Sequence, residues 1–302
     1  MPTFDTPGPI TLTLEFDVGA AHITTGDRAA ATVEVLPADG AKDLDVQAVQ
    51  QTKVSYADGR LLVKGPRKRG LFGRVGALDI SVELPAGSHI RAEAPMGDFR
   101  CQGQYGECRI KASLGDIQLG QAETAELRTG HGDIRVTRVS GPAELTAAGQ
   151  ITLTAVGGLA VIKNLNGDTA VGEAAAGLRA NSSNGRITVD LARGPVDARS
   201  ANGHIHIGAA HAGVEAKTAN GGIRVAEAAR GRLVLETTTG DIDVGVRPPA
   251  AAWLDVHSRY GALRNFLTAT GDPGPEAETV QVHARSAVGD IIIRRPTEGT
   301  PP

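Results

Sequence analysis

The hydrophobic and polar positions of the chain repeat about every 18 residues between Gly97 and Val244. Each repeat opens with a glycine and continues as polar, aliphatic, polar, aliphatic, as in the segment GRITV at 185–189. The opening residues are Gly97, Gly115, Gly132, Gly149, Gly167, Gly185, Gly203, Gly221 and Gly240, spaced 18, 17, 17, 18, 18, 18, 18 and 19 residues apart. A fixed period of this length is typical of stacked repeat architectures.

A second alternating segment precedes most of these glycines. The residues seven and five positions before the glycine are apolar in most repeats, for example Val196 and Ala198 before Gly203. Because side chains alternate between the two faces of a strand, each repeat is expected to supply two strands that each bury one face. The pattern predicts an all-β fold, a parallel β-solenoid of about 18-residue two-strand coils.

Small polar residues stand at the expected corners between strands. The opening glycine directly follows Asn166, Asn184, Asn202 or Asn220 in four repeats. Identical side chains about 4.8 Å apart in a parallel stack can hydrogen-bond along a ladder, and glycine accepts the positive φ of a tight corner. Asn-Gly between alternating strands is also typical of a β-hairpin, so an antiparallel meander is an alternative. A long single-layer meander would leave one face without a core, and we favour the solenoid.

Residues 1–95 are rich in β pattern but lack the period. Alternation predicts strands at 10–16, 31–36, 60–64 and 78–84, and 43–52 is the one expected helix, with Asp43 near its N-cap. An atypical terminal unit fits a β-rich N-terminal cap on a repeat array that covers 96–293. The last residues, 294–302, are predicted to be a disordered tail.

The period loosens after Val244. Loops are predicted at 247–252 and 268–278, the pattern resumes at 253–258, and the segments 280–284 and 289–293 are predicted to close the array. Trp253, the only tryptophan, is expected to form a lid over the last coils. The loops and the cap are expected to limit edge-to-edge growth, which predicts a monomer or a small homo-oligomer.

One strongly basic run lies inside the expected cap. It is bounded by glycine and proline, which predicts a loop, and carries two apolar residues at its tip. We interpret it as a candidate partner-binding loop made of Arg67, Lys68, Arg69, Leu71, Phe72 and Arg74. The alternative is a solvated hairpin tip whose phenylalanine folds back on the cap.

Composition narrows the possible partners and compartments. Aromatic residues make up 3% of the chain and the net charge is −3, which disfavours nucleic-acid binding. The first nine residues show no secretory leader, and no run is long enough to span a bilayer, so we expect a cytoplasmic protein without stable membrane insertion. Cys101 and Cys108 occupy apolar register positions and are expected to be buried thiols, with a disulfide or a reactive thiol as the alternative.

The carboxylates and histidines are weak candidates for catalysis or metal binding. The aspartates that follow an opening glycine share one repeated environment, whereas paired catalytic carboxylates need distinct ones, so we expect them to form turns. His204 and His206 alternate with isoleucines and are expected to face outward, but the neighbouring repeats supply no carboxylate or thiol ligand. No catalytic residue, metal or cofactor is expected.

The GDIxV-like phrases, the Ser-x-Asn-Gly corners and the segment LDISVELPAG at 78–87 resemble the DUF4097 family of adhesin-like β-strand-repeat proteins. The resemblance covers nearly the whole chain, implies a β-solenoid and supplies no established catalytic residues. We hypothesise a non-enzymatic structural or scaffold protein that presents a repetitive surface to an unidentified protein partner or to itself. The alternative is a carbohydrate-active solenoid hydrolase or lyase, which would need a lateral groove lined by unlike acid and base residues.

Overall fold

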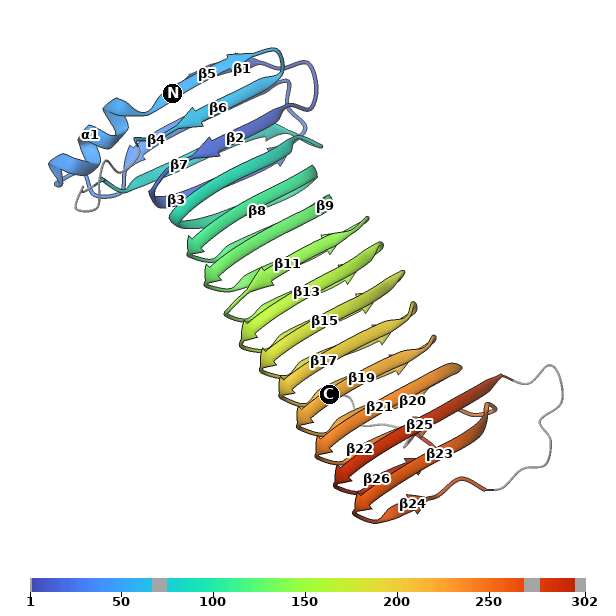
Figure 1. Cartoon of the computed structure of the whole chain (residues 1–302). Helices are drawn as coiled ribbons and strands as arrows, with labels where there is room; N and C mark the ends of the chain where they lie inside the picture. Colours follow the sequence, from blue (N-terminus) through green and yellow to red (C-terminus); the bar gives the residue numbers. More distant parts are fainter. Residues whose placement is uncertain (1, 67–74, 269–277, 297–302) are drawn as a thin grey trace. The chain divides into compact units, whose positions relative to one another are not determined.

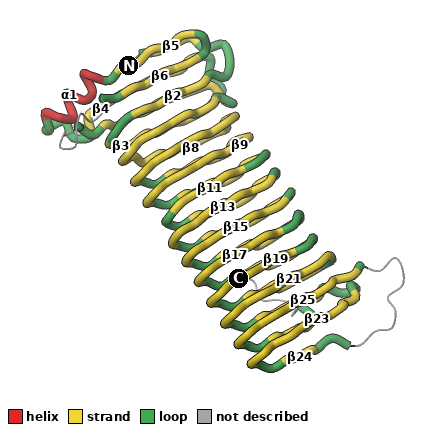
Figure 2. Tube along the Cα trace, viewed as in Figure 1, coloured by secondary structure: helices red, strands yellow, loops and turns green. Residues whose placement is uncertain are grey.

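The structure is a computed structural model that describes residues 2–66, 75–268 and 278–296. The chain forms two compact units, Met1–Gly149 (unit 1) and Gln150–Pro302 (unit 2). Strands dominate both units, and loops are largely confined to the corners between strands (Figure 2). Within the described ranges, no helix combines the length and apolar composition needed to cross a bilayer.

Unit 1 consists of two parallel stacks of strands, joined at the corners (Figure 1). The long strands β8 and β9 turn a corner and contribute to both stacks. The strands are β6 (Arg60–Lys64), β2 (Thr11–Glu15), β7 (Leu78–Pro85), β3 (Val18–Gly26), β8 (His89–Leu114), β9 (Ile117–His131), β10 (Ile134–Val139) and β11 (Ala143–Ala147). The coil formed by β2 and β3 is inserted between β6/β7 and the first half of β8.

Antiparallel strands and one helix complete unit 1. β1 (Thr3–Asp5) pairs with β4 (Ala30–Pro37), β4 pairs with β7, and β5 (Lys53–Ala57) pairs with β6. The predicted helix is confirmed as α1 (Asp43–Gln51), but its N-cap is Lys42, which makes no side-chain cap bond. The carboxylate of Asp45 instead accepts hydrogen bonds from the backbone N–H of Asp39 and Ala77, at 3.2 and 2.8 Å, and so ties the helix to the neighbouring loops.

Unit 2 has the same two-stack construction, and all its strand pairs are parallel. One stack contains, in spatial order, β13 (Leu159–Asn166), β15 (Gly177–Asn184), β17 (Val196–Asn202), β19 (Val214–Asn220), β21 (Gly231–Thr239), β25 (Thr279–Val288) and β23 (Ala251–Tyr260). The other contains β12 (Ile151–Val156), β14 (Thr169–Ala174), β16 (Ile187–Ala192), β18 (Ile205–Ala210), β20 (Ile223–Ala228), β22 (Ile242–Val246), β26 (Ile291–Arg294) and β24 (Leu263–Asn265). The parallel solenoid is therefore confirmed, and the antiparallel meander is excluded for the repeats.

The order of the last two coils differs from the sequence prediction. The coil formed by β25 and β26 lies between β21/β22 and β23/β24, so the segment 251–265 is outermost (Figure 1). The expectation that 280–293 closes the array is wrong. The corner bonds give the same order, because the N–H of Gly240 donates to Val288 and the N–H of Gly289 donates to Tyr260.

The predicted isoleucine column stacks in register inside each unit. In unit 1, Ile134 pairs with Ile117. In unit 2, Ile187, Ile205, Ile223, Ile242 and Ile291 pair in succession, and all five are at most 1% exposed. Aliphatic side chains one strand spacing apart make a thin, dry core, which explains how a chain so poor in aromatic residues can fold.

The corners depend on glycine and on polar ladders. Gly185 has φ +126°, a conformation that side-chain-bearing residues rarely adopt. The amide of Asn184 donates to Asn166, that of Asn202 donates to Asn184, and that of Asn220 donates to Asn202, at 2.9, 3.0 and 2.9 Å. The predicted asparagine ladder is confirmed, and it joins each corner to the next.

Candidate interaction surfaces

The candidate partner-binding residues Arg67, Lys68, Arg69, Leu71, Phe72 and Arg74 all lie outside the described residues. Their role stays a prediction from the sequence. The described chain leads to this loop through β6, where Lys64 forms a 3.2 Å ion pair with Glu15 on β2. The strand that precedes these residues, β6, is paired on both sides, with β2 and with β5.

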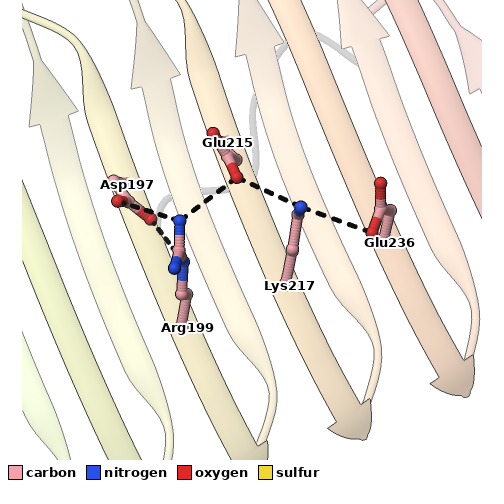
Figure 3. A network of polar contacts seen from close by, with 5 residues as sticks. All are labelled: Asp197, Arg199, Glu215, Lys217 and Glu236. Carbon is pink, nitrogen blue, oxygen red and sulfur yellow. Dashed lines mark hydrogen bonds and ion pairs between the residues drawn. The ribbon is translucent and has the colours of Figure 1, made fainter.

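A ladder of alternating charges runs across the outer face of β17, β19 and β21 in unit 2 (Figure 3). Arg199 contacts Asp197 at 3.0 Å on its own strand and Glu215 at 3.3 Å on the next. Lys217 then contacts Glu215 at 3.2 Å and Glu236 at 3.5 Å. We call these five residues the charge ladder. Each inner member has opposite charges on two sides, so the face is repetitive in shape yet nearly neutral.

The contact between Glu215 and Lys217 favours the ionised form of both side chains. The hydrogen bond from Lys217 lowers the pKa of Glu215, and the same bond raises the pKa of Lys217. A general acid at neutral pH needs a carboxyl pKa raised above its usual value, and a lysine base needs a lowered one. Both shifts run against an acid–base role, and both side chains are well exposed, so the ladder adds little stability.

Unit 1 carries a similar arrangement on the outer face of β8, β9 and β11. Arg109 contacts Glu107 at 2.6 Å and Glu126 at 3.7 Å, and Arg128 contacts Glu126 at 2.9 Å and Glu144 at 3.1 Å. Neither ladder was predicted. The signal was present as opposite charges two residues apart, repeated one period later, but only the strand register places them within contact distance.

The corner aspartates form a second ladder, made of carboxylates and backbone amides. In unit 1, Asp98 Oδ1 accepts the N–H of Asp116 at 2.8 Å, and in unit 2 Asp168 Oδ1 accepts the N–H of Arg186 at 2.8 Å. Asp241 and Asp290 do the same toward Asp290 and Ala262. The predicted turn role is confirmed for these aspartates, since each carboxylate satisfies a donor at the next corner.

The two histidines have different surroundings. His204 occupies a corner aspartate position, and its Nδ1 accepts the N–H of Gly222 at 2.9 Å. Burial and then the charge of Arg224 lower the pKa of His206. Among the described residues no three histidine, cysteine or acidic side chains gather as a metal site. An arginine beside His206 would repel a cation, so this pair is a poor metal site.

A shallow hollow on the outer face of β16, β18, β20 and β22 is lined by His206, Arg224 and Asp243, among others. The carboxylate of Asp243 receives two hydrogen bonds from Arg294, at 2.9 and 2.7 Å, and lies 3.6 Å from Arg224. Two guanidinium groups therefore contact the Asp243 carboxylate, and Asp241, which also lines the hollow, accepts the N–H of Asp290.

The cysteines are free and buried, as expected from their register. Cys101 pairs with Leu119 and Cys108 with Ala125 across the strands. Burial raises the pKa of both thiols, that of Cys108 to about 12. A thiol that stays protonated is a poor nucleophile, which confirms their structural role and disfavours a reactive one.

The outermost coil of unit 2 gathers exposed apolar and aromatic side chains. Trp253 is 56% exposed, Tyr260 64% and Phe266 65%. The Trp253 ring lies 5.3 Å from the ring of His283 on the neighbouring strand β25, which is a side contact and not a cover over the coil. The sequence signal for this surface was the concentration of aromatic residues in one coil of an aromatic-poor chain.

A family model and several solved structures are similar to this chain. A model of the family described as Toastrack DUF4097 matches residues 12–295. Among solved structures, a "putative adhesin" from Parabacteroides merdae is 9% identical with a TM-score of 0.36, covering 97% of this chain and 94% of that one. A "putative adhesin" from Bacteroides fragilis is 12% identical with a TM-score of 0.27, covering 97% and 95%. A comparison with curated proteins found no match.

Proposed function

The chain belongs to the Toastrack DUF4097 family, and we propose that it is a non-enzymatic scaffold whose β-solenoid surfaces bind a protein partner or a second copy. The charge ladder of Asp197, Arg199, Glu215, Lys217 and Glu236 carries this proposal. It is a nearly neutral face on which β17 and β19 repeat one acid–base pair in register, and Glu236 on β21 ends the series. Such a face suits recognition by a partner with complementary spacing better than it suits chemistry on one bond.

The alternative, a carbohydrate-active hydrolase or lyase, finds less support. Catalysis on a glycosidic bond uses two carboxyl groups in unlike environments, one of them kept protonated. The corner aspartates share one environment and accept backbone N–H groups, and Asp243 is held by Arg294. These contacts use the carboxylates for structure.

A hydrolysis assay separates the two functions. Purified full-length protein incubated with a panel of soluble polysaccharides should release no reducing ends above a heat-denatured control. Sugar release that Asp243→Asn abolishes, while the melting temperature stays unchanged, would establish the enzyme in place of the scaffold.

A cytoplasmic location forms part of the proposal. Its support is the pair of free thiols, Cys101 and Cys108, a state that cytoplasmic reductants maintain. Fractionation of native cells tests it, and recovery in the extracellular fraction would overturn it.

The basic loop is the proposed contact for a protein partner. Changing Arg67, Lys68 and Arg69 together to serine should leave the melting temperature within about 2 °C, because the charges of the loop predicted from the sequence should contribute little to stability. The same change should weaken capture of the partner from native cells, most strongly at low salt, since charge steers association. Capture is quantified by mass spectrometry against wild type.

A control is Lys163→Ser with Arg179→Ser, which removes two basic side chains from β13 and β15 of unit 2. Equal capture by the loop variant, the control and the wild type would return the loop to the simpler interpretation of a solvated hairpin tip.

A further inference from the structure

Strand β23 is a long edge strand with one unpaired side. Among the described strands it pairs only with β25, and β24 pairs only with β26. The N–H of Ala251 donates to Glu278 at 3.0 Å, toward β25. Backbone groups alternate sides along a strand, so the N–H and C=O of Leu254, Val256 and Ser258 point to the free side. They form a template for one more strand.

The core of unit 2 reaches this edge without a cover. Leu254 and Val256 continue the buried column of β25, where their register partners Val282 and Ala284 are 0% exposed, yet both are themselves partly exposed. Leu263 continues the isoleucine column and is 51% exposed. Natural edges are usually shortened or blocked by lysine or proline, and this ten-residue strand contains neither.

The outermost strands of unit 1 are built differently. β1 and β5 have three and five residues, both are antiparallel to their neighbours, and β5 begins with Lys53. The rings of Phe4 on β1 and Tyr56 on β5 contact each other at a centroid distance of 5.5 Å. Unit 1 therefore closes its own outer coil, whereas the β23 edge stays open.

We propose that β23 pairs antiparallel with β23 of a second copy about a two-fold axis through Val256, forming a closed dimer. The inference rests on the self-association part of the proposed function and specifies its surface. Residues opposite each other in an antiparallel pair lie on the same face, so only registers centred on a residue keep core side chains facing core side chains. Centred on Val256, the pair places Leu254 opposite Ser258 and joins the two apolar columns.

Charge excludes one neighbouring register, and the cross-linking test below distinguishes the Val256 register from the other. On the outer face the Val256 register sets Asp255 opposite His257 of the second copy, and Trp253 opposite Arg259 of the second copy, a carboxylate–imidazole contact and a cation–π contact. A register centred on His257 would set Asp255 opposite Arg259 of the second copy and Val256 opposite Ser258. A register centred on Asp255 would face that carboxylate with its own copy. Like charges directly opposite destabilise a sheet.

The charged side chains of an interior strand such as β19 have partners on both neighbouring strands, whereas β23 has one neighbouring strand among the described residues. Asp255 contacts Arg285 at 2.9 Å and His283 at 3.2 Å on β25, its one neighbouring strand. Within the described residues His257 has no ion pair or hydrogen bond. The second copy would supply the missing neighbour on the free side. Because a two-fold contact uses the same edge twice, no β23 edge remains free and assembly stops at two copies.

Sedimentation equilibrium of the full chain tests the assembly. Wild type should give twice the monomer mass of 31.1 kDa, and Val256→Arg should give the monomer mass, because two guanidinium groups would meet at the axis. Leu165→Arg, at an apolar residue that is 58% exposed on β13, is the matched control and should stay dimeric. Circular dichroism and the melting temperature check that each variant folds.

Cysteine cross-linking tests the register without adding a charge. Opposite residues of a hydrogen-bonded antiparallel pair have Cα atoms about 5.5 Å apart, within reach of a disulfide. Val256→Cys should therefore form a covalent dimer under mild oxidation. Leu254→Cys should not, because its copy lies four residues away along the strand, roughly 13 Å. The double variant Leu254→Cys with Ser258→Cys should cross-link again. The wild-type protein, whose two native cysteines are buried, gives the background level of cross-linking.

Either of two results would overturn the inference: a wild-type protein that is monomeric at all concentrations, or a dimer that Val256→Arg leaves intact and Val256→Cys fails to cross-link. Preferential cross-linking of Leu254→Cys would refute the register. These failures differ from failure of the scaffold function, because a monomer that hydrolyses no polysaccharide still fits a scaffold for another protein.

Discussion

Replacing Ile205 with aspartate should destabilise the protein by at least about 4 kcal/mol, because the change buries an unpaired carboxylate in an apolar stack. Ile205 is 1% exposed and lies between Ile187 and Ile223 on the adjacent coils. No polar group of the column is positioned to pair with the charge. Urea unfolding followed by circular dichroism measures the change as a lower midpoint at similar slope.

Thr188→Asp is the control, since Thr188 lies on the outer face next to Ile187 on β16. Thr188 is half-buried and lies outside the core, so this change should alter the free energy of unfolding by less than about 1 kcal/mol. We take about 1 kcal/mol as the threshold, which is well below the difference expected from burial. If the free energies of unfolding of the two variants differed by less than this, the apolar column would not account for the stability.

Gly185→Ala should cost about 2–4 kcal/mol, because the corner leaves no room for a methyl group and its φ of +126° disfavours any side chain. A Cβ at this position would come within 2.1 Å of the carbonyl oxygen of Gly167. Relief requires opening the corner, which would also disturb the hydrogen bond from the Gly185 N–H to Asn202. Thermal unfolding should show the loss as a lower midpoint.

Gly40→Ala serves as its control. A Cβ at Gly40 meets nothing within 4 Å, and its φ lies outside the positive region. This substitution should leave the free energy of unfolding unchanged or raise it by up to about 1 kcal/mol, because alanine lowers the conformational entropy of the unfolded chain. A Gly185→Ala protein as stable as Gly40→Ala would show that the corner can relax, contrary to the close approach in the structure.

Sequence reasoning about the candidate sites succeeded where a residue's role is repeated. The corner aspartates, the asparagine ladder and the buried cysteines each follow from one position copied along the period. It missed the charge ladder because an ion pair depends on which strand lies beside which and on side-chain conformation. The contact of Lys217 with Glu236, for example, joins residues separated by one period plus one inserted residue.

The sequence by itself determined the coil. A period of about 18 residues, two alternating segments and a glycine at the corner specify which side chains face inward, because alternation in a strand and positive φ at glycine are local properties. The pairing of Ile187 with Ile205 then follows from stacking equal coils.

Only the tertiary structure decided the order of the coils where the period loosens. Every coil presents the same apolar columns and free backbone edges. The segment 251–265 could therefore pair with β21 and β22 as well as the segment 279–294 does. Local pattern cannot distinguish such neighbours. Their choice depends on the packing of whole coils and the path of the connecting loops, and it leaves Leu254, Val256 and Leu263 at the open edge.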